Sequence, residues 1–299
     1  MISTDLAMGI IFLSQTALGM MGNSALLCCF IINKFSGIRA RPTDLIVKHL
    51  TCANFMVLIC KGIPQTMAAF GWTYFLDTIE CKLVFYFHRI ARGVSLGSTA
   101  LLSFFQAIMI TPSNAKYKYI KVRANDIIGP SVSMCWSLQM MLNGFIPVLV
   151  TDLGDGKNVT DFGDFLYCVV TKPQNLTYAL YVILLGSSDV ICLALMIWAS
   201  VSMVLILLKH KQRVQYMHRV LCPKSSPETR ATQTILVLVS SFVFFYTTSG
   251  MLTMCLTSVN GITKWLVNVS VATAACFPAL CPFLLIRHYT SVSMLCCTC

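Results

Sequence analysis

The side chains that could do chemistry in this sequence follow none of the spacings that catalysis or metal binding requires. Its five histidines are dispersed, and none belongs to an H-E-x-x-H motif or to a cluster with metal-ligand spacing: His49, His88, His210, His218 and His288. Hydrolytic and zinc centres need such groups close together on one helix face or loop. We therefore expect no catalytic residue, no bound metal and no cofactor, which argues against an enzyme.

A second set of reactive groups lies inside strongly apolar stretches. It consists of five ionisable residues: Lys61, His88, Arg89, Arg92 and Asp189. A charge within a membrane segment usually pairs with a neighbour or extends toward the membrane surface, and otherwise it marks a site that binds a ligand or ion. Both interpretations remain open for each residue taken by itself.

The stretch from Cys81 to Pro112 carries a polar seam. On an α-helix the side chains of this seam fall within about 40° of the direction of Cys81, and they are His88, Arg92, Ser95, Thr99, Ser103 and Gln106. The other faces are apolar. A helix from Cys81 to Gln106 rises roughly 37 Å, enough to cross a bilayer. The stretch therefore predicts a transmembrane helix inside a bundle, and the rest of the chain must supply its neighbours.

The composition agrees with a membrane protein. The chain is 57% hydrophobic and only 11% charged, with a mean hydropathy of +0.75, whereas soluble domains carry about 25% charged residues. We expect an all-α membrane protein with one seven-helix domain over residues 1–299, and spans at 7–32, 45–70, 82–110, 129–150, 178–208, 227–257 and 265–286. Gly129-Pro130 and Ser226-Pro227 are favourable starts for the fourth and sixth spans, because proline suits the first helical position.

Lys and Arg are distributed unequally between the two sets of loops. One set, which includes the C-terminal tail, carries fourteen of them and the other carries four, together with the sequons at Asn158 and Asn175. This bias predicts a plasma-membrane protein with its N-terminus outside and its C-terminus in the cytoplasm. The net charge of +11 therefore reflects orientation and contact with the lipid bilayer, and it does not indicate a nucleic-acid partner.

Most of the fifteen cysteines are scattered through the apolar spans as small core residues. Cys81, at the outer end of the third span, and Cys168, in an outer loop, remain in an oxidising compartment, so we expect them to form a disulfide. Cys255 is the alternative partner. Cys296, Cys297 and Cys299 lie just inside the membrane, where they are either palmitoylated or free thiols.

Seven spans, an outer N-terminus and a disulfide from the third span to an outer loop resemble a G-protein-coupled receptor. Gly22-Asn23 and Trp136 match the rhodopsin-like pattern, but Gln106 stands where that class has the arginine of its Asp-Arg-Tyr triplet. Several stretches resemble the vomeronasal type 1 receptor family: DLIVKHLTCAN, KGIPQTMAAFG, CKLVFYFHRIARGVS, SFFQAIMITP, HKQRVQYMHR, SSPETRATQTILVLVSSFVFFYT and CFPALCPF. The resemblance extends from the first span to the end of the seventh.

The resemblance implies that the chain detects pheromones or other small chemosignals and couples to an inhibitory-type heterotrimeric G protein. Only about six residues precede the first span, so we expect the ligand to enter the outer half of the bundle, where the five ionisable residues lie. The candidate G-protein face is polar and mostly basic, and it consists of Gln106, Lys209, Lys211, Arg213 and Arg230.

Arg92 and Asp189 are expected to pair. Each lies 11 residues below the outer end of its span, about 16 Å deep, and the third and fifth helices are neighbours in receptors of this type. Asp189 is the only acid deep in any span, which leaves Lys61 and Arg89 without a second acid and favours an anionic or strongly hydrogen-bond-accepting ligand. The alternative is that Arg92 binds the ligand while Asp189 faces water.

Two other membrane classes are disfavoured. A transporter would usually show an inverted repeat with interrupted helices in matching positions, and the seven spans show no self-similarity. A retinal protein needs a lysine deep in the seventh span, and none lies between Trp265 and Ile286.

Overall fold

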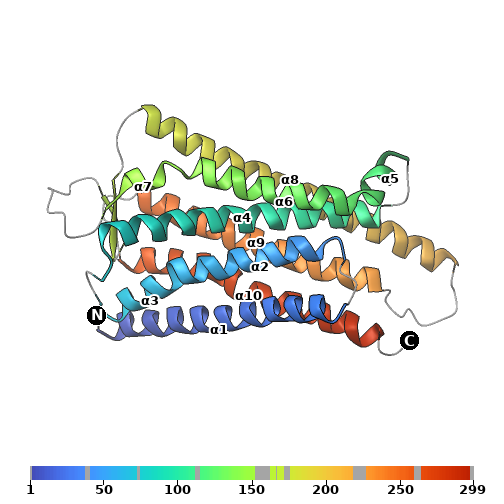
Figure 1. Cartoon of the computed structure of the whole chain (residues 1–299), viewed down its shortest axis with the longest axis horizontal. Helices are drawn as coiled ribbons and strands as arrows, with labels where there is room; N and C mark the ends of the chain where they lie inside the picture. The colour runs from blue at the N-terminus through green and yellow to red at the C-terminus, as the bar shows by residue number, and fades with distance from the viewer. Residues whose placement is uncertain are drawn as a thin grey trace.

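The computed structural model describes residues 2–37, 41–72, 75–111, 115–151, 162–165, 167–171, 176–217, 227–258 and 264–296. Seven helical units within these ranges are long and apolar enough to cross a membrane (Figure 1). They are α1 (Ile2–Phe35), the unit of α2 (Asp44–Val57), η1 (Leu58–Gly62) and α3 (Ile63–Ala69), α4 (Thr78–Ile110), α6 (Ala124–Leu142) with α7 (Ile146–Leu149), α8 (Leu176–Met217), α9 (Pro227–Ser258) and α10 (Lys264–Cys296). The predicted class, an all-helical seven-span bundle, is confirmed.

A small antiparallel sheet lies at one end of the bundle. Its strands are β1 (Val150–Thr151), β2 (Phe162–Phe165) and β3 (Cys168–Thr171), with β3 in the middle. Val150 pairs with Val170, and Phe165 pairs with Cys168. Figure 1 shows the N-terminus at the end that carries the sheet and the C-terminus at the other. We refer to these as the sheet end and the opposite end.

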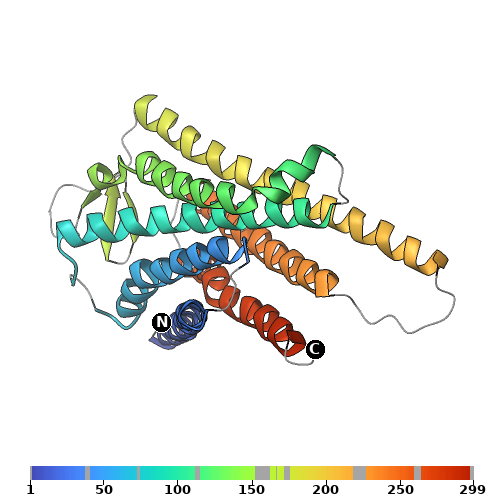
Figure 2. The same ribbon diagram turned by 45° about the vertical axis from the view of Figure 1, so that its right-hand side comes forward.

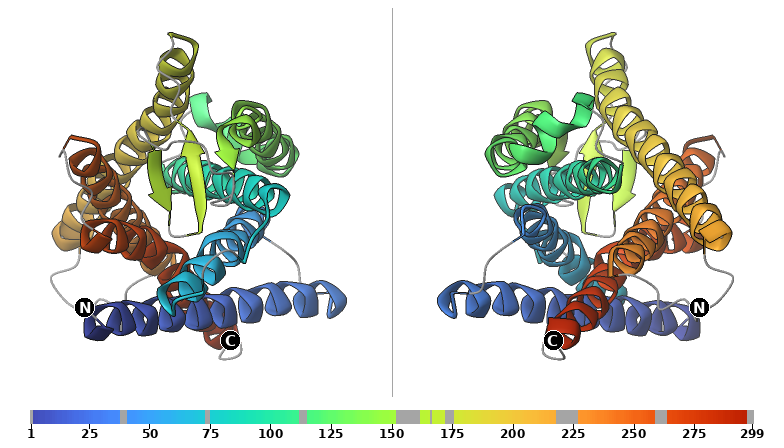
Figure 3. Two further views of the ribbon diagram at one scale, coloured as in Figure 1. Left: turned by 90° about the vertical axis from the view of Figure 1, so that its left-hand side faces the viewer. Right: turned by 90° about the vertical axis from the view of Figure 1, so that its right-hand side faces the viewer.

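The other helices pack around α4. It contacts α2, α6, α8 and α9, and the end-on views of Figure 3 show it among them. Of its most apolar segment 72% is buried, against 17–44% in the other six spans. The helix begins with a capping box, in which the Asp77 carboxylate accepts from the backbone N–H of Glu80 and the Glu80 carboxylate accepts from that of Asp77. It ends before Thr111, whose backbone is extended because Pro112 follows.

Two glycines one turn apart allow α6 to approach α4 closely. A Cβ atom at Gly93 would overlap the side chain of Gln139, and one at Gly97 would overlap Sγ of Cys135. Cys135 and Gln139 are themselves one turn apart on α6. Small residues at this spacing favour close packing of membrane helices, so these glycines set the distance between α4 and α6.

The second spanning unit, which the sequence predicts as an apolar span over 45–70, has an interruption in its helix. Leu58–Gly62 form the π-helical segment η1 between α2 and α3, just before Pro64. Proline has no N–H to bond the carbonyl of Cys60 four residues earlier, and its ring crowds that carbonyl. The wider π turn accommodates this crowding.

The fourth span differs from its prediction in where its helix begins. It was expected to begin at Gly129-Pro130, but α6 begins at Ala124 and holds Pro130 in its interior. A proline at this position has no N–H to bond the carbonyl of Asp126, four residues earlier. The span was expected to continue to about Val150, and the apolar unit of α6 and α7 reaches Leu149, but α6 itself ends earlier. The helix ends at Leu142 because Pro147 cannot donate to the carbonyl of Asn143, which instead accepts from Ile146.

Two helices run beyond the apolar spans that were expected for them. α8 continues to Met217 and α10 to Cys296, although their apolar segments end at Lys209 and Ile286. Figure 2 shows the last turns of α8 projecting beyond the neighbouring helices. Hydropathy reports the length of chain in contact with hydrocarbon, while the helix itself continues into the polar surroundings.

Candidate functional site

A disulfide binds the start of α4 to the sheet. Cys81, in the first turn of α4, is bonded to Cys168, the first residue of β3, with their Cα atoms 6.0 Å apart. Both residues are fully buried and pack with Ala68 and Val150. The predicted pairing is confirmed, and Cys255 is therefore not the partner of either cysteine.

Tyr167, immediately before β3, is the largest side chain of this cluster. It is 2% exposed, and its ring lies 6.1 Å from that of Phe75 and 6.2 Å from that of Phe85, measured between centroids. Burial raises the pKa of the Tyr167 phenol well above its ordinary value, so the hydroxyl stays neutral. The phenol also lies close enough to Cys60 of η1 to interact with it electrostatically. Through these ring contacts Tyr167 connects the sheet with α4 and the segment that precedes it.

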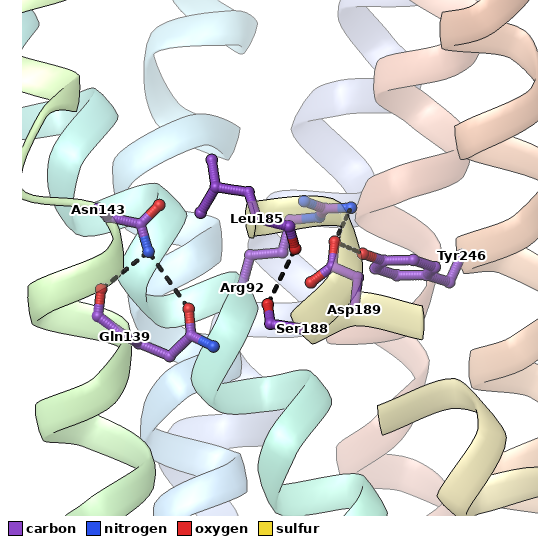
Figure 4. A network of polar contacts seen from close by, with 7 residues as sticks. All are labelled: Arg92, Gln139, Asn143, Leu185, Ser188, Asp189 and Tyr246. Atoms are coloured by element: carbon purple, nitrogen blue, oxygen red, sulfur yellow. Dashed lines mark hydrogen bonds and ion pairs between the residues drawn. The ribbon is translucent and has the colours of Figure 1, made fainter. Parts of the chain in front are cut away.

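Deeper in the bundle, three polar side chains from three helices meet (Figure 4). Nη2 of Arg92 on α4 lies 3.9 Å from Oδ2 of Asp189 on α8, which is the predicted ion pair. The hydroxyl of Tyr246 on α9 donates a hydrogen bond to the same Oδ2. The guanidinium of Arg92 also lies over the Tyr246 ring, 4.6 Å from its centroid. Arg92 and Asp189 remain 36% and 26% exposed, so the contact is not sealed from its surroundings.

The other predicted charges lie around this contact. Lys61 is in η1, and His88 and Arg89 precede Arg92 by about one turn toward the sheet end; all are half-buried. Lys61, Arg89 and Arg92 are close enough to repel one another, and Asp189 acts on Arg89 as well. The five predicted residues thus come together in the half of the bundle near the sheet. Together, the three basic side chains and the one carboxylate give this group an excess of positive charge.

The three hydroxyl-bearing residues of the polar seam on α4 are neutral and buried. Ser95 Oγ donates to Oδ1 of Asn54 on α2 at 2.7 Å. Thr99 and Ser103 donate to the backbone carbonyls four residues earlier. These contacts satisfy the hydroxyl groups within the bundle. The charged part of the seam is therefore confined to the sheet half.

The residues predicted to contact a G protein lie toward the opposite end. Gln106 is half-buried near the end of α4, and Lys209 is exposed on α8. Lys211 and Arg213 follow on α8, and Arg230 lies in the first turn of α9. α8 and α9 contact each other and both contact α4. The sequons at Asn158 and Asn175 lie outside the described residues, as do Cys297 and Cys299.

Sequence reasoning missed two residues at this site. Tyr246 carries no charge and stands in an aromatic run, SSFVFFYT, so nothing local separates it from packing residues. Gln65 is 1% exposed, and neither Nε2 nor Oε1 has a hydrogen-bond partner in the described structure. A polar residue four positions after Lys61 was the available signal for Gln65. Among the residues that the structure describes, no group of three or more His, Cys, Asp or Glu could hold a metal ion.

Comparison with known proteins shows which family the chain belongs to. Residues 6–298 match the vomeronasal organ pheromone receptor family. The chain is 46% identical over 297 residues to vomeronasal type-1 receptor 4 of Pongo pygmaeus and of Homo sapiens, which covers 99% of this chain and 98% of each relative. Vomeronasal type-1 receptor 1 of Homo sapiens is 44% identical over 293 residues, 97% of this chain and 82% of that protein.

The fold has a counterpart among solved structures. Squid rhodopsin superposes with a TM-score of 0.73 over 98% of this chain and 85% of its own, at 13% sequence identity, so this likeness concerns the fold alone. The family match covers nearly the whole chain, and it is a match to receptors, not to enzymes. The chain is therefore a seven-span membrane receptor that belongs to the vomeronasal organ pheromone receptor family.

Proposed function

We propose that this receptor binds small pheromone-like molecules among the charged side chains of the sheet half and activates an inhibitory-type heterotrimeric G protein. The contact among Arg92, Asp189 and Tyr246 carries this proposal, because it joins α4, α8 and α9 at one depth. A charge inside a bundle is costly unless it is paired. A ligand that engages one member changes the partners of the other two, and so it acts on three helices at once.

The proposal includes the orientation of the receptor in the plasma membrane, with the sheet end outside. The disulfide at the sheet end requires an oxidising compartment. In the sequence, the sequon at Asn158 lies between β1 and β2, and the sequon at Asn175 follows β3. The loops at the opposite end carry most of the Lys and Arg residues outside the spans, as expected for the cytoplasmic side.

Coupling to the G protein is proposed at the opposite end. α8 extends past its apolar segment by two turns, and Lys209, Lys211 and Arg213 lie at the start of this extension. Gln106 on α4 and Arg230 on α9 belong to the helices that Arg92 and Tyr246 join. A shift of α8 or α9 at the ligand site would therefore move this face.

The test is ligand-evoked signalling in cells that express the receptor with an N-terminal tag. A panel of volatile and steroid-like compounds is screened for a fall in cyclic AMP that pertussis toxin blocks. If the proposed orientation is correct, the N-terminal tag should be accessible to labelling on intact cells. The triple change of Lys209, Lys211 and Arg213 to Gln should reduce G-protein activation severalfold while agonist binding and surface level stay unchanged. Unchanged signalling at equal surface level would contradict the coupling face, and a tag labelled only after permeabilisation would contradict the orientation.

A further inference from the structure

Gln65 on α3 is a fully buried amide to which the fold offers no hydrogen-bond partner. Its side chain is 1% exposed, and both Nε2 and Oε1 lack a partner among the described residues. Buried amides in folded proteins are nearly always satisfied, because losing water without a replacement destabilises the folded state. An exception needs a specific cause, such as strain, a catalytic role or a missing water or ion, and departures from the folding rules are expected at functional sites.

Helical spacing places Gln65 on the face of its helix that meets α4. Lys61, Gln65 and Ala68 follow one another at intervals of four and three residues, so they share a face. Lys61 interacts electrostatically with Arg89 and Arg92 of α4, and Ala68 packs in the cluster of Cys81 and Cys168. Gln65 lies between these two contacts.

A neighbouring face of the same helix points toward α1, and this defines how the helix is rotated about its axis. A Cβ atom at Gly62 would meet the side chain of Thr16 on α1. Thr66, one turn later on the same face, donates its hydroxyl to the Gly62 carbonyl at 2.7 Å. Gly62 and Thr66 therefore face α1, and the stripe that contains Gln65 faces the charged half of α4.

Tyr167 lies near this stretch of the helix on the side of the sheet. The tyrosine packs in the same cluster as Ala68, three residues after Gln65, and its phenol lies close enough to Cys60 to interact with it electrostatically. A ligand that reaches the amide of Gln65 therefore enters a region that Tyr167 borders.

We propose that Gln65 and Lys61 form the subsite for the polar head of the ligand, and that this head is an oxyanion such as a carboxylate. Nε2 of Gln65 donates to the oxyanion, and the ammonium of Lys61 interacts with its charge. A hydroxyl or amine next to the oxyanion donates to Oε1. The anionic class follows from the positive field that Lys61, Arg89 and Arg92 create together. This inference deepens the proposed function and rests on it.

The first experiment needs no ligand. Gln65→Met keeps the length of the side chain and removes the unpartnered amide, so it should raise the melting temperature of the purified receptor, by roughly 2–6 °C. Gln139→Met is the matched control. Gln139 is also buried, but its Oε1 accepts from Nδ2 of Asn143 at 3.2 Å, so the same substitution there should lower the melting temperature. If Gln65→Met lowers it as well, the amide is structural and the proposal is wrong.

The second experiment uses pairs of small carboxylic acids and their methyl esters, with 2-hydroxy-4-phenylbutyrate and 4-phenylbutyrate among them. Acids should activate or stabilise the receptor and their esters should not. Gln65→Met should raise the half-maximal concentration of an active acid about ten- to a hundredfold, as expected for a lost hydrogen bond to a charged group. Esters as potent as their acids, or a Gln65→Met receptor with unchanged potency, would overturn the subsite while leaving the proposed function intact. A wild-type receptor that no compound activates would instead overturn the proposed function, and the subsite with it.

Discussion

At the scale of single residues, Arg92 and Tyr246 share one oxygen atom, Oδ2 of Asp189. The arginine approaches it to 3.9 Å, and the tyrosine hydroxyl donates a hydrogen bond to it. The tyrosine ring at the same time lies beneath the guanidinium. Tyr246 therefore holds both charged groups, and the ion pair depends on a residue from a third helix.

This dependence leads to a prediction for Tyr246→Phe. The change keeps the ring under Arg92 and removes the hydrogen bond to a carboxylate, which should cost about 1.5–3 kcal/mol of stability. Thermal unfolding of the purified receptor measures it, with Asp189→Asn as the second arm of a double-mutant cycle. The two changes should be less than additive, because each removes the same charge-assisted bond. Strict additivity would show that the two side chains do not interact.

At the scale of helices, the contact between α4 and α6 depends on the absence of side chains. Gly93 and Gly97 leave room for Gln139 and Cys135, and a Cβ atom at either glycine would overlap its neighbour. Helices in a bilayer associate through such close contacts, because no hydrophobic effect drives them together within lipid. The position of α6 is therefore sensitive to one methyl group on α4.

Gly97→Ala should lower the melting temperature and the surface level, because the new methyl group displaces Sγ of Cys135 and moves α6 away. Adding Cys135→Ala should restore much of the loss, since the remaining Cβ of residue 135 lies 3.9 Å away, an ordinary contact. Gly186→Ala on α8 is the control. Nothing lies within 4 Å of its new Cβ, so it should be neutral or stabilising. Failure of Cys135→Ala to restore Gly97→Ala would contradict this packing.

At the scale of the whole molecule, the disulfide connects parts of the chain that are far apart in sequence. Cys81 and Cys168 are 87 residues apart, and their bond joins the start of the central helix to the sheet. In the chain-entropy description, closing a loop of this length stabilises the fold by roughly 4–5 kcal/mol. The sheet, Tyr167 and the first turn of α4 therefore form one connected unit.

Cys81→Ala and Cys168→Ala should each abolish surface delivery, and the double variant should be no worse than either single one, because each loses the same bond. Flow cytometry of tagged receptors on intact cells measures this. Cys29→Ala replaces a free, exposed cysteine and should leave surface delivery unchanged. Normal delivery and response of Cys168→Ala would show that the bond is dispensable.

The sequence by itself determined the number of spans, the polar seam of α4, the cystine and the ion pair of Arg92 with Asp189. The spans, the seam and the depth of the two charges rest on local properties, namely the length of an apolar run and the helical position of a side chain. The cystine rests on which cysteines lie on the outer side, and the neighbourhood of the third and fifth helices rests on the resemblance to known receptors. Two charges at equal depth in neighbouring helices have few other partners, so their pairing follows from counting residues.

Only the tertiary structure decided which uncharged residues lie beside the charged residues and between the helices. Whether Tyr246, Gln65 or Cys135 faces a given neighbour depends on the rotation and separation of helices distant in sequence, and hydropathy contains no information on either. The local rules also failed where packing outweighed them. Pro130 lies inside α6 although it removes a hydrogen bond of that helix, and Pro64 is accommodated by a π turn in the unit that carries Lys61 and Gln65.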